Sequence, residues 1–396
     1  MKIPIKEMSY LAIVFFFSVA LNPEWSSNSL LWWGSFFALL IVTCITNKFK
    51  IRCKINFFKI WGISFLIICC ISLSYALNRS ASLECIKTLI VLFVVLFLID
   101  DKIDTREEVE TYMKLFLVSL FTMISYVLIN VDLKSFQLAQ HGEATTGLWN
   151  GNDVGMKCAL FIIIILYFID NSTKSVQQLF LLISTVPAVV LVYYTASRKA
   201  FLMVALGISL FYYLKHPTKK IRNLLVIIVG IYIAYMLMMN NKDLYAAIGW
   251  RIEGALALFQ KGGKADSSAL LRARYIQVGV SAWKKSPIIG YGINNYRVIN
   301  LRETGHFTYS HNNYVEILVG IGLIGFILYY SYYIKLLYDY MKIYFKHQTD
   351  KILNITGICF LLMFLMQFGV VSYSSIEQML LILFMTKAVE FNKKMT

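Results

Sequence analysis

Long apolar runs separated by short polar turns fill most of this 396-residue chain. A bilayer core of roughly 30 Å requires about 20 apolar residues per helix, and many of the runs approach that length. The candidate runs begin near Met8, Ser29, Ile60, Cys85, Tyr112, Val154, Leu179, Ala200, Leu224, Asn313, Ile352 and Met379. The pattern predicts an all-α, polytopic integral membrane protein with about 12 transmembrane helices.

One polar stretch, residues 240–312, interrupts the apolar pattern and predicts a large helical loop outside the membrane. It separates an expected N-terminal transmembrane bundle of about nine helices, residues 1–239, from about three C-terminal transmembrane helices, residues 313–396. Within the loop, an amphipathic helix at the membrane surface is expected from Ser268 to Lys285. Its apolar residues recur at helical spacing, at Leu271, Tyr275, Val278 and Ala282.

Composition agrees with the membrane class, because only 15% of the residues are charged and 58% are hydrophobic. A soluble domain has a charged fraction of about 25%. The first apolar run, Tyr10–Leu21, lacks a small-residue cleavage site, so we expect it to remain as a helix. The seven cysteines are odd in number and indicate neither a disulfide framework nor a metal site.

Lysine and arginine are concentrated in alternate turns, near residues 2–6, 48–54, 174, 215–222, 335–351 and 393–394. Such residues are retained on the cytoplasmic side of a membrane, which predicts that both termini are cytoplasmic and that residues 240–312 face the opposite side. The net charge of +16 lies mostly in these turns, where anionic lipid headgroups attract it. We therefore expect the basic residues of these turns to bind membrane lipids, and we expect no binding of nucleic acid.

The outer loop also carries basic residues, which the retention rule does not explain. They are Lys242, Arg251, Lys261, Lys264, Arg272, Arg274, Lys284, Lys285, Arg297 and Arg302. Together they indicate a site for an anionic ligand near His311. The alternative is an interfacial helix whose arginines touch only lipid headgroups.

His311 is the strongest candidate for chemistry. It precedes an apolar helix, Asn312 is next to it, and Glu316 lies about one turn further on. A helix N-terminus disfavours an imidazolium and favours nearby anions, so a neutral imidazole there could act as a general base. A cap or an interface residue is the plainer interpretation of a lone histidine. Gly320, Gly322 and Gly325 are expected to let this helix pack closely against its neighbours.

Other polar residues of the outer face could contact a sugar or a phosphate. Tyr291, Asn294 and Asn295 lie in an aromatic turn, and Asn150 and Asn152 precede the sixth span. An aromatic belt at the membrane interface and simple helix capping by Asp153 are the alternatives. Arg198 joins two apolar spans with almost no loop, where an unpaired charge costs a few kcal/mol, so it either binds an anion or snorkels to the interface.

Four motifs resemble elements of the O-antigen ligase and O-antigen polymerase superfamily. His311-Asn312, then nine residues, then Gly322-Leu323-Ile324-Gly325 resembles its His-(Asn/Ser/Gln)-x9-Gly-x-x-Gly signature. Ser197-Arg198-Lys199-Ala200 resembles its Ser-Arg-x-Ala element. Asn150-Gly151-Asn152-Asp153 resembles its asparagine-containing turn, and residues 287–292 resemble its Pro-x-x-Gly-x-Gly turn.

The resemblance implies a metal-independent glycosyltransferase of the bacterial inner membrane, with its active site on the outer side. The donor would be a glycan on undecaprenyl diphosphate, and no cofactor is implied. Arg198, Lys199, Arg272 and Arg274 would bind the diphosphate, with Arg272 and Arg274 also stabilising charge on the leaving group. His311 would orient or deprotonate the acceptor hydroxyl. Asn150, Asn152, Tyr291, Asn294, Asn295, Asn312 and Glu316 are the expected glycan or acceptor contacts.

Within the superfamily we favour a polymerase, which transfers a growing glycan onto the next lipid-linked repeat unit of a lipopolysaccharide or capsule. The passage Tyr309–Tyr330 resembles polymerases more than core ligases. A ligase, which transfers the finished glycan to lipid A core or another acceptor, stays open. Expected partners are lipid-linked oligosaccharide, membrane lipids, a chain-length regulator and a flippase.

Two rival classes explain the sequence less well. A flippase or other transporter is expected to carry charges near the bilayer midplane and internal repeats, whereas the charges here gather at one face and no repeat is evident. A structural membrane scaffold leaves the outer basic residues without a purpose.

Overall fold

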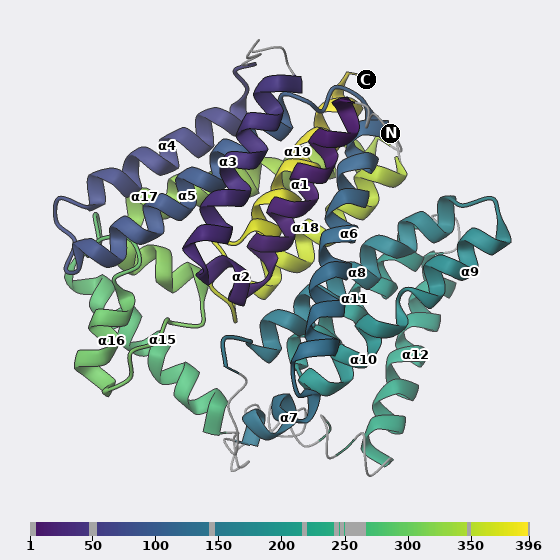
Figure 1. Ribbon diagram of the computed structural model, residues 1–396. Coiled ribbons are helices and arrows are strands. Elements are labelled where there is room, and N and C mark those ends of the chain that lie inside the picture. The colour runs from purple at the N-terminus through teal and green to yellow at the C-terminus, as the bar shows by residue number, and fades with distance from the viewer. Residues whose placement is uncertain are drawn as a thin grey trace. The chain divides into compact units, whose positions relative to one another are not determined.

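Helices make up the regular structure of the computed structural model, which describes residues 5–46, 54–141, 147–215, 220–240, 245, 249, 267–346 and 350–394 (Figure 1). These residues contain no strand, so the all-α prediction is confirmed for this part of the chain. They form two compact units: the first comprises Met1–Ile51 and Glu110–Lys264, and the second comprises Arg52–Val109 and Ala265–Thr396. Each unit therefore combines segments that are far apart in the sequence.

The first unit is built around α8, Gly151–Asn171, an apolar helix whose residues are buried on nearly every side. Helices that are hydrophobic all round are the ones that a protein can enclose completely. α10 (Val186–Thr195) and α11 (Arg198–Lys215) pack against α8. The other helices of this unit are α1 (Ile5–Leu21), α2 (Pro23–Ser27), α3 (Ser29–Thr46), α6 (Arg106–Asn130, which begins in the second unit), α7 (Leu133–His141), α9 (Ser175–Ile183) and α12 (Lys220–Asn240).

The second unit is organised by α17, Asn313–Phe345, which contacts helices from both ends of the unit's sequence. These neighbours are α4 (Phe57–Ser72), α15 (Ser267–Lys285), α16 (Tyr296–Thr304) and α19 (Ile376–Lys393). α5 (Arg79–Asp100) packs on α4 and α19, and α18 (Lys351–Met366) packs on α19. Aromatic rings fill the contact between α4 and α17, where Trp61 stacks on Tyr332 with ring centroids 5.0 Å apart.

Among the described residues, six helices are long and apolar enough to cross a membrane. They are Ser29–Thr46, Arg79–Asp100, Arg106–Asn130, Gly151–Asn171, Ser175–Thr195 (α9 with α10) and Asn313–Phe345. Shorter apolar helices, among them Phe57–Ser72 and Lys351–Met366, occupy other predicted spans. The membrane class is thus confirmed, while the number of about 12 spans and the orientation of the termini stay predictions.

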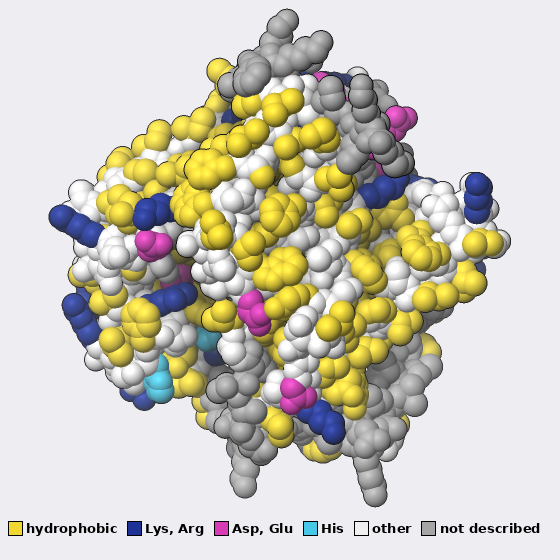
Figure 2. Space-filling model, in the orientation of Figure 1, with side chains coloured by type: hydrophobic (Ala, Val, Ile, Leu, Met, Phe, Trp, Pro, Cys, Tyr) yellow, Lys and Arg dark blue, Asp and Glu magenta, His cyan; other side chains and the backbone are white. Residues whose placement is uncertain are grey.

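Many large apolar side chains are exposed, as a lipid-facing surface requires. Val176 is 81% exposed and Ile334 is 64% exposed. Hydrophobic side chains accordingly cover much of the face shown in Figure 2. In water such patches would favour aggregation.

Charged side chains are buried where α4, α5 and α19 meet in the second unit. Lys59 lies 2.5 Å from Asp101 and 3.4 Å from Asp100, and Lys387 lies 2.7 Å from Asp100. The side chains of Lys59, Asp100 and Lys387 are each at most 6% exposed. Buried charges persist only when they are paired, so this cluster ties the start of α4 and the end of α5 to α19.

The two units divide the chain differently from the predicted order of bundle, loop and C-terminal helices. α4 and α5 belong with the C-terminal helices, because they pack on α17 and α19. Residues 250–266, with Arg251, Lys261 and Lys264, lie outside the described residues, as does Lys242. The extent of the predicted loop, residues 240–312, therefore stays a prediction.

Candidate active site

The amphipathic helix expected in the outer loop is present as α15, and one of its faces packs against protein. Tyr275 joins Tyr296 of α16 and Val315 and Val319 of α17 in a buried cluster. Gly279 permits this close approach, because a Cβ there would lie 2.2 Å from Val315 Cγ1. α15 is thus fixed to α16 and α17, and its predicted position at the membrane surface stays a prediction.

α17 is interrupted at Gly322, whose φ of 66° and ψ of −168° are not helical. The turn that follows α15, residues 287–292, docks at this interruption. Tyr291 N–H donates to the Val319 carbonyl at 2.9 Å. Gly292 N–H donates to the Gly320 carbonyl at 2.8 Å. The turn therefore satisfies two carbonyls that a continuous helix would pair with its own next turn.

The same docking satisfies the amides on the other side of the interruption. Leu323 N–H donates to the Pro287 carbonyl at 2.8 Å, and Ile324 N–H donates to the Ile288 carbonyl at 3.3 Å. A Cβ on Gly322 would lie 2.1 Å from the Ile288 carbonyl oxygen. Gly322 therefore adopts a positive φ and leaves room for the backbone of the turn at residues 287–292 to approach α17 closely. Two of the recognised motifs form one backbone assembly.

His311 stands immediately before α17 in the left-handed conformation, with φ 55°. Its neighbours in the sequence, Ser310 and Asn312, are both buried. Asn312 is the N-cap of α17, and its side chain accepts a hydrogen bond from Val315 N–H at 3.1 Å. A non-glycine residue in this conformation costs on the order of 1–3 kcal/mol and persists only where its surroundings hold it. The helix start predicted at His311 is thus confirmed.

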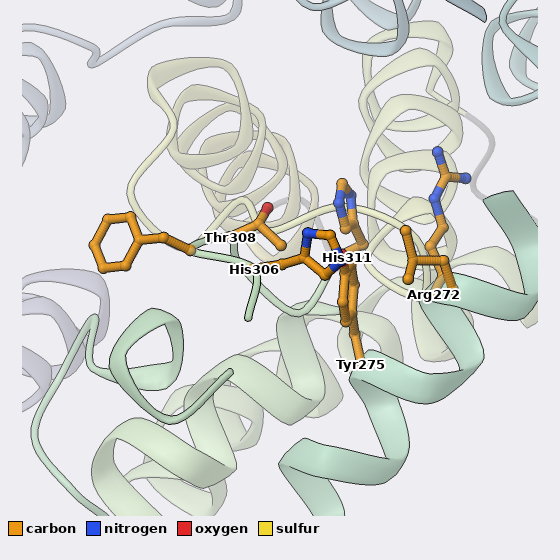
Figure 3. A pocket seen from close by; sticks show the side chains of 7 residues that line it. Arg272, Tyr275, His306, Thr308 and His311 are labelled. Atoms are coloured by element: carbon orange, nitrogen blue, oxygen red, sulfur yellow. The ribbon is translucent and has the colours of Figure 1, made fainter. Parts of the chain in front are cut away.

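His311 lines a pocket of about 280 Å³ with Leu271, Arg272, Tyr275, His306, Phe307 and Thr308. Figure 3 shows the two imidazoles beside the Tyr275 ring, with Arg272 extending from α15 next to them. The His311 ring is nearly parallel to that of Tyr275, at an interplanar angle of 11° and a centroid distance of 6.1 Å. The His306 ring meets Tyr275 edge-on at 6.2 Å. A guanidinium, two imidazoles and a hydroxyl thus surround one cavity, which suits an anionic ligand.

The structure separates the two candidate arginines of α15. Arg272 is half-buried and lines the pocket, whereas Arg274 is exposed and does not line it. Residues two apart on a helix do not share a face, which explains the difference. Only Arg272 is brought together with His311, and the role of either arginine in catalysis stays a prediction.

Two tyrosines near the pocket are held neutral by burial. Desolvation raises the pKa of Tyr275, against a smaller opposing effect of Arg274. Desolvation also raises the pKa of Tyr296, with Glu316 and Tyr275 adding to the rise. The Tyr296 hydroxyl donates to the Tyr275 carbonyl at 2.7 Å, so it fixes α15 to α16. Neither phenol is therefore suited to be a base at neutral pH.

The residues of the aromatic turn make hydrogen bonds within the protein. The Tyr291 hydroxyl donates to the Ala282 carbonyl at 3.1 Å, and Asn294 donates to the Ala81 carbonyl at 3.2 Å. Asn295 is fully buried, and its amide oxygen accepts from Asn78 N–H at 2.6 Å. They join α15 and the loop before α16 to the start of α5. Their contact with a glycan stays a prediction.

Glu316, also expected to contact a glycan, is 1% exposed in the first turn of α17. Its Oε2 accepts from the Ser310 backbone N–H at 3.0 Å and from the Ser310 hydroxyl at 2.7 Å. The Asn312 amide group is likewise occupied, since it donates to the Phe368 carbonyl at 3.3 Å. Both side chains hold the segment around His311, and a direct glycan contact of either stays a prediction.

The other two motifs meet in the first unit, where α8 begins and α11 begins. Asn150 caps α8 by accepting hydrogen bonds from Asn152 and Asp153 N–H. The Ser197 hydroxyl donates to Asn152 Oδ1 at 3.0 Å. A Cβ on Gly155 would lie 2.8 Å from the Cβ of Ala200, so the small residues let the two helices touch. The capping that was expected of Asp153 comes from Asn150 instead, because Asp153 already lies inside the first turn of α8.

Arg198 and Lys199 open α11 two residues after the left-handed residue Ala196, which has φ 47°. Thr195 and Ser197, on either side of Ala196, are fully buried. The predicted near-absence of a loop between the two apolar segments is thus confirmed. The binding of a diphosphate by Arg198 and Lys199 stays a prediction.

His306, Thr308 and Tyr275 are pocket residues for which the sequence suggested no role in chemistry. His306 follows Gly305, the left-handed residue that ends α16, and lies five positions before His311. The presence of a second histidine so close to His311 in the same polar segment could have identified His306 as a candidate. Tyr275 was visible only as one apolar position of an amphipathic helix.

Among the described residues, no group of three or more His, Cys, Asp and Glu side chains could hold a metal ion. Metal independence itself stays a prediction. Arg272, His306 and His311 could instead bind a phosphate group directly, with no ion between them.

Residues 179–330 match the family described as O-antigen ligase. The match includes residues 197–200, residues 287–292 and His311, and it leaves out the turn at residues 150–153. No curated protein matches the chain. Members of the matched family are membrane enzymes of glycosyltransferase type that act on lipid-linked glycans. The match over α9 to α17 confirms the resemblance of this part of the chain to the O-antigen ligase and polymerase superfamily.

Proposed function

We propose that the protein is a membrane glycosyltransferase that moves a glycan from undecaprenyl diphosphate to a hydroxyl group of an acceptor at the outer face of the bacterial inner membrane. The observation that carries this proposal is the pocket that Arg272 and His311 line together. Arg272 belongs to α15 and His311 to the motif segment before α17, and both lie inside the matched residues 179–330.

In the proposed reaction, Arg272 binds the diphosphate of the donor. His311 takes the proton of the acceptor hydroxyl as its oxygen attacks the anomeric carbon. The new glycosidic bond forms while the bond from the anomeric carbon to the phosphate oxygen breaks, and undecaprenyl diphosphate leaves with the electron pair. The guanidinium stabilises the charge that develops on the leaving group.

The size of the pocket limits what it can hold. At about 280 Å³ it lies near the lower end of the range of about 300–1,000 Å³ that is common for small-ligand sites. It fits the reacting groups of the donor rather than a long glycan. We therefore propose that the remainder of the chain of sugars lies outside this cavity.

Polymerisation is the reaction that we favour, because the passage Tyr309–Tyr330 resembles polymerases. Ligation to lipid A core or another acceptor is the second candidate, and the description of the matched family as O-antigen ligase favours it. A chain-length regulator and a flippase are proposed as protein partners of either activity.

Incubation of the purified protein with its lipid-linked repeat unit alone tests the proposal. A polymerase produces a ladder of longer lipid-linked glycans, whereas a ligase produces a product only when a core acceptor is added. No product under either condition, with the lipid-linked unit carried across the membrane of proteoliposomes instead, would establish a flippase. A preparation in which Arg272→Ala and His311→Ala keep full transfer activity would contradict the proposed site.

A further inference from the structure

The backbone at His311 is held from both sides by buried polar groups. Ser310 is fully buried, and its hydroxyl also accepts a hydrogen bond from Asn312 N–H at 3.2 Å. Asn312 is itself held as the N-cap of α17. Because the residues before and after it are fixed, His311 keeps its left-handed conformation and presents its ring to Tyr275.

Glu316 is the side chain on which this arrangement depends. A single oxygen, Oε2, receives both the backbone and the hydroxyl hydrogen bond of Ser310. A glutamate in the first turn of a helix that reaches back to the residues before the helix resembles a capping box, in which the side chain satisfies an otherwise unpaired amide. Here the satisfied amide belongs to the residue that directly precedes His311.

Arg297 of α16 supports the same segment from the other side. Its guanidinium lies over the Tyr309 ring at 5.7 Å, and the Tyr309 ring lies 4.3 Å from that of His311. Arg297 also interacts electrostatically with Glu316. Arg297 Nε and Glu316 Oε1 are both buried without a hydrogen-bond partner among the described residues. Arg297 and Glu316 each contact a neighbour of His311, since Arg297 lies over the Tyr309 ring and Glu316 accepts from Ser310.

We propose that Glu316 is a positioning residue of the active site, which fixes the left-handed backbone of His311 through Ser310 and so places the imidazole in the pocket. This role rests on the proposed function of His311 as a base. It differs from the glycan contact that the sequence suggested, because the carboxylate is 1% exposed and faces Ser310.

The variants Glu316→Gln and Glu316→Ala separate positioning from contact. Glutamine keeps an oxygen that can accept from Ser310, so we expect kcat within about threefold of the native value. Alanine removes both hydrogen bonds, and displacement of a catalytic group typically lowers kcat by about 100-fold with little change in KM. Glu303→Ala, at an exposed glutamate in the last turn of α16, is the control and is expected to behave as the native protein.

A second measurement does not depend on activity. Diethyl pyrocarbonate modifies accessible imidazoles, and mass spectrometry gives the ratio of modified His311 to modified His306 in the same molecule. His306 is exposed and serves as the internal reference. We expect this ratio to rise at least about threefold in Glu316→Ala, because the segment opens locally, and to stay unchanged in Glu316→Gln and Glu303→Ala.

The outcomes decide between the interpretations. An unchanged modification ratio in Glu316→Ala overturns the proposal, whatever its activity. A loss in Glu316→Gln as large as in Glu316→Ala, with a raised KM, also overturns it and indicates contact with the substrate. If the native protein transfers no glycan but the ratio rises as expected, the positioning role stands and the proposed function fails.

Discussion

The α8–α11 junction of the first unit and the α15–α17 junction of the second unit each bring two recognised motifs together, but they do so by different means. At the first, Ser197 binds Asn152 through side chains, and Ala200 packs on Gly155. At the second, residues 287–292 pair with the interrupted helix α17 through backbone groups.

The two junctions differ in whether the side chains or the backbone of the motif residues make the contact. At the first junction the side chains of Ser197 and Asn152 bind each other and hold the two helices together. At the second junction the hydrogen bonds join backbone groups, and other residues of the same unit, among them His311 and Arg272, line the pocket. The comparison predicts that changes at the second junction affect catalysis strongly, whereas changes at the first affect mainly stability.

The largest effect is expected for His311→Ala. Loss of a general base typically lowers kcat by 10²–10⁴-fold, and we expect about 10³-fold here, with a small change in KM. The measurement is the initial rate of glycan transfer with the lipid-linked repeat unit. His306→Ala is the comparison, and we expect a loss of about tenfold or less, because it lines the pocket without acting as the base. Equal losses of kcat in both histidine variants would contradict the role of His311 as the general base.

Gly322→Ala tests the backbone assembly itself. The new Cβ would lie 2.1 Å from the Ile288 carbonyl oxygen at a positive φ, so we expect a loss of stability of about 3 kcal/mol or more. Thermal unfolding in detergent measures it. Gly34→Ala in α3, where a Cβ meets nothing within 4 Å, is the matched control and should be neutral or slightly stabilising. A stable, active Gly322→Ala protein would contradict the interruption of α17.

Arg272→Ala and Arg274→Ala distinguish the pocket from the surface of α15. We expect Arg272→Ala to lower kcat by about 100-fold, because it removes a charge that stabilises the leaving diphosphate. We expect Arg274→Ala to change the rate less than about threefold, because Arg274 is exposed outside the pocket. The measurement is the rate of glycan transfer by the two purified variants. A larger loss in Arg274→Ala than in Arg272→Ala would assign the binding of the diphosphate to Arg274.

The smallest effect is expected at the first junction. Ser197→Ala removes the hydrogen bond to Asn152 and the one accepted from Ala200 N–H, and the expected loss of stability is about 1–2 kcal/mol. Ser184→Ala is the control, because its hydroxyl bonds only to the Leu181 carbonyl of its own helix. Unfolding temperatures of both variants provide the measurement. A large loss of transfer activity in Ser197→Ala with unchanged stability would show that this junction takes part in catalysis.

Much of the helical structure follows from the sequence, because apolar runs bounded by polar turns have few alternatives in a membrane. α8, α11 and α17 begin within a few residues of the predicted starts near Val154, Ala200 and Asn313. The span near Leu179 is less regular, since it is divided into α9 and α10 at Ser184 and Thr185. The local signal for this division is Pro187, which stands in the first turn of α10 and is disfavoured inside a helix.

The candidate site was predictable only in part. His311 and Arg272 were identified from their motifs and their charge. Nothing in the spacing of Arg272 and Arg274 showed which of them faces the histidine, because that depends on how α15 rotates against α17. His306 and Tyr275 became pocket residues only when α15, α16 and the segment before α17 packed together.

The sequence by itself determined the membrane class, the helical character, the family resemblance and the position of the histidine, since these follow from local composition and from short motifs. The tertiary structure alone decided that Glu316 points back to Ser310, that Gly322 interrupts α17, and that Arg272 rather than Arg274 lies beside His311. The physical reason is that apolar periodicity specifies where a helix begins and ends. The partners of its buried polar groups come from segments far away in the chain.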